Sequence, residues 1–105
     1  MFNKKWSTLL MAVVLAIAVF APVFYTGYSS IQHAASEFAA QNFIAASEHY
    51  QQAARLLFWR TDLWEKAGIA EYANKNYPAA IAFLKRQSKL TEQGWVALGN
   101  SYSNT

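Results

Sequence analysis

The sequence predicts an all-α chain in which one N-terminal membrane-spanning helix is followed by a short array of helical hairpins, an array of about five helices. Three observations predict this class. No charged residue occurs from Trp6 to Ser36, a residue pattern recurs at a fixed interval, and later apolar residues are spaced by three and four. We assign residues 1–5 to a cytoplasmic tail, 6–28 to the transmembrane helix and 29–105 to the helical domain.

The expected membrane span is apolar and is bounded by aromatic residues at both ends, Trp6 and Tyr28. A helix rises ~1.5 Å per residue, so this stretch is roughly 33 Å long and can cross a hydrocarbon core of ~30 Å. The residues expected at the two membrane interfaces are Lys4, Lys5, Trp6, Tyr25 and Tyr28.

A cleaved secretory signal peptide is the alternative for this segment, because its N-terminus is basic. The apolar stretch exceeds the usual signal core, and Pro22 directly follows the best cleavage position, Ala21. We therefore expect a retained signal-anchor in the cell (inner) membrane, with a kink at Pro22. Basic residues flank only its N-terminal side, which predicts a cytoplasmic N-terminus and a periplasmic or otherwise extracytoplasmic domain.

Composition excludes several kinds of partner. The chain has no cysteine, and hence no disulfide, thiolate nucleophile or zinc cluster. Of its nine Lys and Arg residues two are Lys4 and Lys5, which leaves seven against six acidic residues in the remainder. This balance predicts no nucleic-acid partner, since a phosphate backbone needs a basic stripe. We expect no cofactor and no metal.

The internal repeat lies beyond the span. The positions matched at one constant interval are Phe38 and Tyr72, Asn42 and Asn76, Phe43 and Tyr77, Ala45 and Ala79, Ala46 and Ala80, and Tyr50 and Leu84. Further on, Trp95, Leu98, Gly99 and Tyr102 form the pattern W-x2-L-G-x2-Y, with a weaker version at Trp64 and Gly68.

These motifs resemble the tetratricopeptide repeat, a family of helical-hairpin arrays that bind other proteins. The resemblance covers roughly three quarters of the chain. It implies one degenerate repeat at about 29–60, a better one at 61–92 and a partial third helix at 93–105. Ser30 stands where the first repeat would have Trp, and the spacing from Trp64 to Trp95 is shorter than the period of the family. Because about three repeats are needed for a stable array, we expect this domain to depend on a partner.

Local residue choices fit the same fold. Small residues are expected where paired helices approach closely, at Ala46, Gly68, Ala80 and Gly99. Asp62 and Glu65 have the spacing of a capping box, and Pro78 is placed for the first turn of a helix. Asn42 and Asn76 suit the turns between paired helices.

The resemblance also implies a binding groove, lined by the first helix of each repeat. By position, the partner-binding residues are Ile31, Ala35, Phe38, Asp62, Glu65, Ile69 and Tyr72. Phe38 and Tyr72 fit a core position equally well. A possible second interface is formed by Phe58, Trp59 and Arg60, which could instead pack on the next helix or touch the bilayer.

No catalytic set is recognisable. His33 and His49 are far apart in the sequence, and we expect both to be interfacial or surface residues. No serine lies in a nucleophile turn and no glycine-rich phosphate loop occurs. The sequence therefore predicts a protein that is not an enzyme.

Three functional hypotheses follow. The first is an accessory or scaffold subunit of a larger membrane complex, whose partners are other subunits and the lipid bilayer. The second is a membrane-anchored receptor or chaperone-like adaptor that binds transient peptides in its groove. The third is that the sequence is the first part of a longer repeat array, interrupted after Tyr102.

Overall fold

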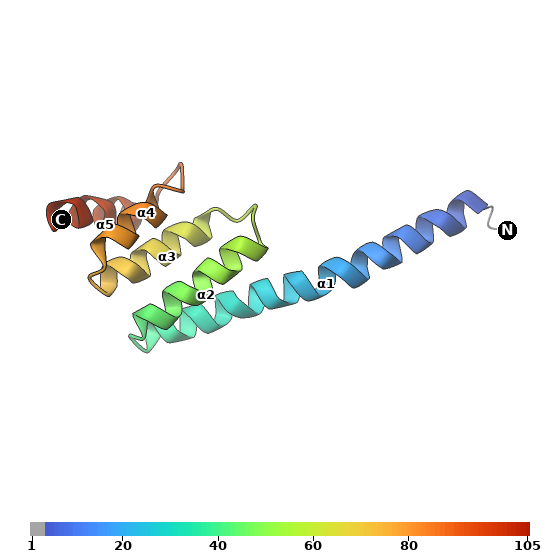
Figure 1. Ribbon diagram of the computed structural model, residues 1–105, viewed down its shortest axis with the longest axis horizontal. Helices are drawn as coiled ribbons and strands as arrows, with labels where there is room; N and C mark the ends of the chain where they lie inside the picture. Colours follow the sequence, from blue (N-terminus) through green and yellow to red (C-terminus); the bar gives the residue numbers. More distant parts are fainter. Residues whose placement is uncertain (1–3) are drawn as a thin grey trace.

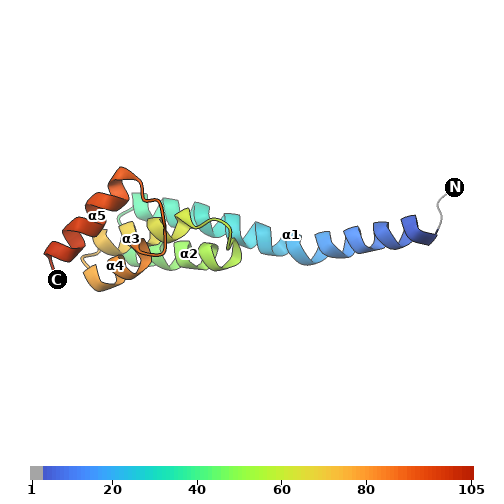
Figure 2. The same ribbon diagram turned by 90° about the horizontal axis from the view of Figure 1, so that it is seen from above.

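A long N-terminal helix and a cluster of four shorter ones make up the computed structural model, which describes residues 4–105. The helices are α1 (Lys4–Ala39), α2 (Phe43–Leu56), α3 (Asp62–Ala73), α4 (Tyr77–Leu84) and α5 (Glu92–Ser103). The described residues contain no strand, which confirms the predicted all-α class. Figures 1 and 2 show α1 projecting from the helical domain as an arm, in a molecule 67 Å long and 27 Å wide.

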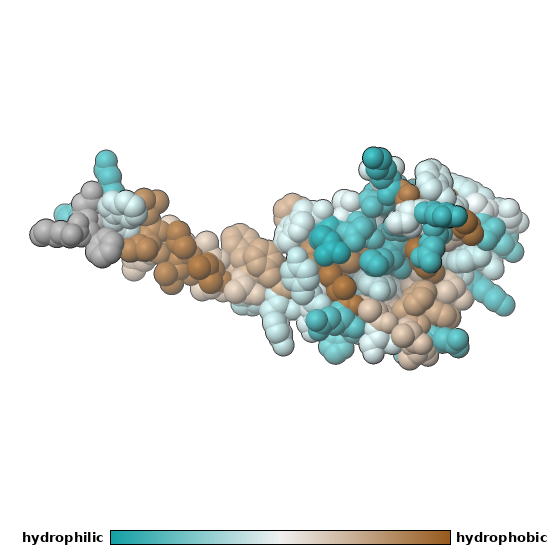
Figure 3. Space-filling model, turned by 180° about the vertical axis from the view of Figure 1, so that it is seen from behind, coloured by the Kyte–Doolittle hydropathy of each residue, from teal (hydrophilic) through white to brown (hydrophobic). Residues whose placement is uncertain are grey.

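Helix α1 is long and apolar enough to cross a membrane, by length and composition. None of its most apolar stretch is buried within the described structure. The core helix of a soluble protein would be covered by its neighbours, whereas this arm is apolar and bare (Figure 3). The first three residues of the predicted tail lie outside the described part of the chain.

The end of the expected span at residue 28 is not a break in the chain. Helix α1 continues to Ala39, so the arm and the first helix of the hairpin array form one element. Pro22 lies inside this helix and does not end it, so the kink at Pro22 stays a prediction. The domain is therefore joined to the arm without a flexible linker.

The domain is an array of antiparallel hairpins. The C-terminal half of α1 packs on α2, α2 on α3 and α3 on α4, while α5 packs on both α3 and α4. Two clusters of buried residues form the core: Ala34, Tyr50, Ala53, Ala54, Leu57, Leu63 and Ala67 in the first, and Ala80, Leu84 and Ala97 in the second. The abundance of alanine lets the helices approach closely.

The two tight turns, one in each repeat, have the same backbone geometry at matching positions. Gln41 and Lys75 both have φ of 64°. The following amides, of Asn42 and Asn76, donate to carbonyl oxygens of Glu37 and Glu71 at 2.8 and 2.9 Å, which is the bond of a Schellman motif. The asparagines lie in the turns as predicted, but neither side chain makes a capping hydrogen bond. The internal repeat of the sequence is thus also a repeat of structure.

Other local predictions had mixed outcomes. Pro78 lies in the first turn of α4, as predicted. The capping box was wrong, because Thr61 precedes α3 and accepts no capping hydrogen bond, while Asp62 and Glu65 bind elsewhere. The prediction of a close helix contact was right for Gly68 and wrong for Gly99, as described below.

Candidate docking surfaces

A groove opens between the end of α1, helix α3 and helix α5, with a volume of about 390 Å³. Three residues predicted to bind a partner, Phe38, Ile69 and Tyr72, lie together in its wall. The remaining wall comes from α5, through Glu92, Gln93, Val96 and Ala97. The lining is mainly apolar, which suits side chains of a partner protein.

The aromatic residues of the groove are held in place by their neighbours. The Phe38 ring meets Phe43 edge-on, with ring centroids 5.1 Å apart. The Tyr72 hydroxyl accepts a hydrogen bond of 3.0 Å from the Asn100 side chain, which links α3 to α5. Ile69 packs against the second core cluster. Phe38 and Tyr72 therefore have fixed positions while one side of each faces the groove.

Four other predicted groove residues lie elsewhere. Ile31 packs against the first core cluster, and Ala35 is exposed on α1 but does not line the groove. Asp62 pairs with Arg60 and Glu65 is buried at 4% exposure, so neither faces a partner there. These four residues do not line the groove, because the rotation of each helix about its axis turns them away from it.

Glu65 attaches α5 to α3. Its carboxylate accepts hydrogen bonds from the Thr91 amide at 2.6 Å and the Thr91 hydroxyl at 2.8 Å. The same hydroxyl accepts from the Gly94 amide at 3.3 Å and caps α5. A Cβ atom on Gly94 would collide with the Glu65 carboxylate, so any other residue here would displace that carboxylate. A buried carboxylate that accepts both hydrogen bonds through Oε1 helps to fix where α5 starts.

Helix α5 also presents an open apolar face. Trp95 is 60% exposed and Tyr102 50%. A Cβ atom built on Gly99 would meet nothing within 4 Å, whereas one on Gly68 would come within 2.7 Å of Leu84 Cγ. The two glycines occupy matching places in the repeat pattern. One is pressed against a neighbouring helix and the other is not.

The predicted second interface is the loop between α2 and α3. The Trp59 ring meets Phe24 of α1 edge-on at 5.5 Å, and Phe58 meets Trp59 at 5.2 Å. Arg60 donates two hydrogen bonds to the Asp62 carboxylate, at 3.0 and 2.9 Å. This pair lowers the pKa of Asp62 and raises that of Arg60, in each case chiefly through these hydrogen bonds.

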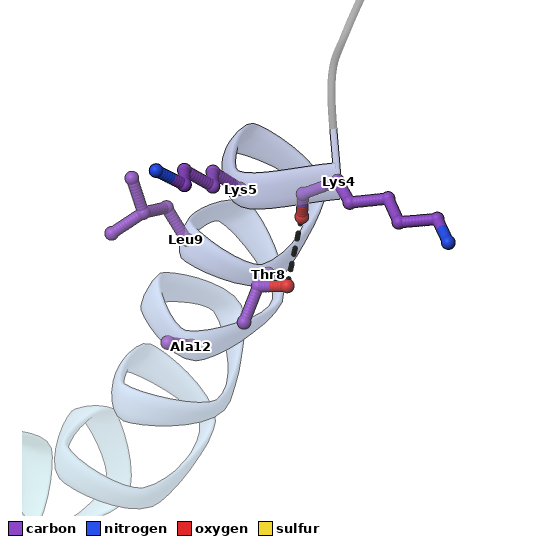
Figure 4. Close-up of a pocket in the computed structure, with 5 residues that line it drawn as sticks. All are labelled: Lys4, Lys5, Thr8, Leu9 and Ala12. Carbon is purple, nitrogen blue, oxygen red and sulfur yellow. Dashed lines mark hydrogen bonds between the residues drawn. The ribbon is translucent and has the colours of Figure 1, made fainter.

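The predicted interface residues of α1 lie at the two ends of its apolar stretch. Lys4 and Lys5 extend in different directions from the first turn, beside a shallow hollow along this one helix (Figure 4). Thr8 donates its hydroxyl hydrogen to the Lys4 carbonyl at 2.8 Å. Trp6, Tyr25 and Tyr28 are exposed.

The two histidines lie closer together than the sequence suggested. The rings of His33 and His49 are 5.7 Å apart, and His49 Nδ1 lies 2.7 Å from a carboxylate oxygen of Glu37. His33 and Glu37 are one helical turn apart on α1, but no sequence signal placed His49 beside them. Among the described residues, no group of three or more His, Cys, Asp or Glu side chains is placed to hold a metal ion.

Comparisons with protein-family models, with curated proteins and with solved structures gave no match for this chain. The resemblance to tetratricopeptide repeats therefore stays a prediction from the sequence.

Proposed function

We propose that this chain is a non-catalytic accessory subunit of a larger membrane protein complex, anchored by α1 and docking through its tetratricopeptide-like domain. The open face of α5 carries the proposal. Trp and Tyr are the residues on which binding energy most often concentrates. Here Trp95 and Tyr102 are at least half exposed on one helix.

The contacts that α4 makes with α3 indicate what kind of element could cover the open face of α5. Trp64 of α3 stacks on Phe83 with ring centroids 5.6 Å apart, and the Arg86 guanidinium lies 4.1 Å from the Trp64 ring centre. Gly68 of α3 receives Leu84. A partner helix that crosses α5 as α4 crosses α3 would place a large aliphatic residue on Gly99 and cover Trp95.

The proposed topology puts the N-terminus in the cytoplasm and the domain in the periplasm or its equivalent. Lys4 and Lys5 support this orientation, because basic residues are retained on the cytoplasmic side of a span. The next basic residue along the chain is Arg55.

The test compares wild type with Gly99→Leu in membranes solubilised in mild detergent. Wild type is expected to co-purify with a fixed set of other membrane proteins. Gly99→Leu should lose that set while its helical content and elution as a free chain stay unchanged, because a Cβ atom at this position meets nothing within 4 Å. Wild type running alone as a folded monomer would contradict the proposal.

The groove favours a second candidate, a receptor that captures transient peptides. Its supporting observation is the convergence of Phe38, Ile69 and Tyr72 on one hollow. Val96→Asp is the suitable variant, since Val96 is 55% exposed whereas Ile69 also packs on the core. Loss of peptide binding with Val96→Asp, and normal binding with Gly99→Leu, would favour the receptor over the subunit.

Measuring the intact mass of the protein from its native membrane controls for cover of α5 by further residues of the same chain. A mass above that of the printed sequence would allow further residues of the same chain to cover α5. The open face would then be internal, and the subunit proposal would lose its main support.

A further inference from the structure

We propose that the loop at residues 57–61 is a second membrane contact, with Phe58 and Trp59 inserted among lipids at the C-terminal end of the α1 span. The inference rests on the proposed anchoring by α1. It adds a fixed height and tilt for the helical domain above the bilayer.

The first support is where the loop touches α1. Trp59 packs edge-on against Phe24, with ring centroids 5.5 Å apart and planes at 81°. Phe24 precedes Tyr28, the expected interface residue, by one helical turn, or ~6 Å along the axis. The Trp59 ring is therefore held beside the last turn of the apolar stretch, on the membrane side of Tyr28.

The second support is that the loop is fixed against α1. Leu57 is fully buried at 0% exposure, and a Cβ atom on Gly27 would come within 2.7 Å of Leu57 Cγ. Glycine at this position lets the loop approach the α1 backbone. Since α1 runs as one helix into the domain, the loop cannot move away from the span without losing this contact.

The third support is an apolar surface that continues from the span onto the loop. Phe20 and Phe24 are 54% and 40% exposed and stack at 6.2 Å, and Trp59 and Phe58 extend that surface at 48% and 76% exposure. A surface continuous with the lipid-facing side of a span is expected to meet the same lipids. Trp in particular favours the interfacial layer, with its apolar body toward the hydrocarbon.

The polar end of the loop lies where headgroups and water would be. Arg60 is paired with Asp62, and Tyr28 adds a smaller contribution to the raised pKa of the Arg60 guanidinium. The order along the loop is thus aromatic residues next to the span, followed by a charged pair at the level of Tyr28. This is the distribution of an interfacial segment.

The chain has no cysteine, so single-cysteine variants can carry a nitroxide spin label without other changes. The variants are Phe58→Cys in the loop, Val14→Cys in the span and Trp95→Cys on α5, all at positions more than half exposed. Each labelled full chain is reconstituted in phosphatidylcholine vesicles. Collision rates with oxygen, which concentrates in lipid, and with a water-soluble nickel chelate then report depth.

The label at residue 58 is expected to collide with oxygen several-fold more than with the chelate, as at residue 14, while residue 95 shows the reverse. A label at residue 58 that behaves like residue 95, with residue 14 in lipid, would overturn the loop contact and leave the anchor intact. If residue 14 also reports water, the anchor and the loop contact both fail. Circular dichroism of each variant checks that its helical content equals that of wild type.

Discussion

Helices α3 and α5 carry related residues in different surroundings. In α3, Trp64 stacks on Phe83 and Gly68 is pressed by Leu84, both from α4. In α5, Trp95 is 60% exposed and Gly99 meets nothing. The same pattern of Trp and Gly thus serves once as an internal helix contact and once as exposed surface.

The same pattern thus occurs in two surroundings, one covered by α4 and the other open in the described residues. The α5 face would cost free energy in water, since exposed aromatic surface forgoes about 25 cal/mol per Å² of burial. Under the proposed function, a partner helix would recover that free energy. The following experiments test how α5 is attached and how it differs from α3.

The largest expected effect is at the attachment of α5. Glu65→Ala removes the acceptor of two hydrogen bonds from Thr91 and leaves a backbone amide unpaired. We expect a loss of about 2–3 kcal/mol in the free energy of unfolding, and faster hydrogen exchange throughout α5. Glu65→Gln keeps an acceptor oxygen and is the matched control, with a smaller loss. Equal losses for the two variants would contradict the assigned role of the carboxylate.

The second prediction tests the comparison itself with one substitution at two positions. Gly68→Ala places a Cβ atom against Leu84 and should destabilise the domain by about 1–2 kcal/mol after the gain in helix propensity. Gly99→Ala meets open space and should stabilise the free chain by about 0.5–1 kcal/mol. Denaturant unfolding of the purified chain measures both. If both substitutions changed the free energy of unfolding in the same direction, the two glycines would have similar surroundings.

The third prediction uses the two matched turns as an internal standard. Gln41 and Lys75 hold a left-handed conformation that glycine adopts without strain. Gln41→Gly and Lys75→Gly should each raise the free energy of unfolding, by about 0.5–1 kcal/mol and by similar amounts. Thermal unfolding compares them. If one substitution raised the free energy of unfolding and the other lowered it, the two turns would not be equivalent.

The smallest effect concerns how α3 begins, since α5 starts with a Thr91 cap and α3 with the Arg60–Asp62 pair. The pKa of Asp62 is lowered in the folded chain, so its contribution is present above the unfolded value of about 3.9 and is lost as the pH falls through the folded value. Because the Asp62 side chain is 39% exposed, we expect less than about 1 kcal/mol.

A carboxyl titration followed by NMR, in wild type and Arg60→Ala, measures this directly. The pKa of Asp62 should rise toward its ordinary value in the variant. An unchanged pKa would show that Arg60 does not hold the carboxylate.

The sequence allowed the all-α class, the hairpin order and the turns to be predicted, because each depends on periodicity and on residues close in the chain. Asp62 and Glu65 show why contacts between residues far apart in the sequence could not be predicted. Their spacing fits a local capping box, yet the Glu65 carboxylate binds Thr91, 26 positions away. Spacing along one helix does not report which distant group it faces.

Gly68 and Gly99 likewise show that the local sequence does not reveal whether a residue contacts a neighbouring helix. Their sequence contexts are alike, and only the position of α4 distinguishes them. The groove was predicted in part, through Phe38, Ile69 and Tyr72, while the contribution of α5 was missed. The rotation of each helix about its axis decides such cases, and it is set by packing throughout the domain.

The central claim is that another protein covers the open face of α5. A photoreactive benzoylphenylalanine in place of Trp95 tests it most directly, in native membranes and with the same label at Glu48 as a control on exposed α2 surface. The account predicts one discrete crosslinked product from residue 95, absent from residue 48 and lost when Gly99→Leu is added. No product from residue 95, or the same products from both positions, would contradict it.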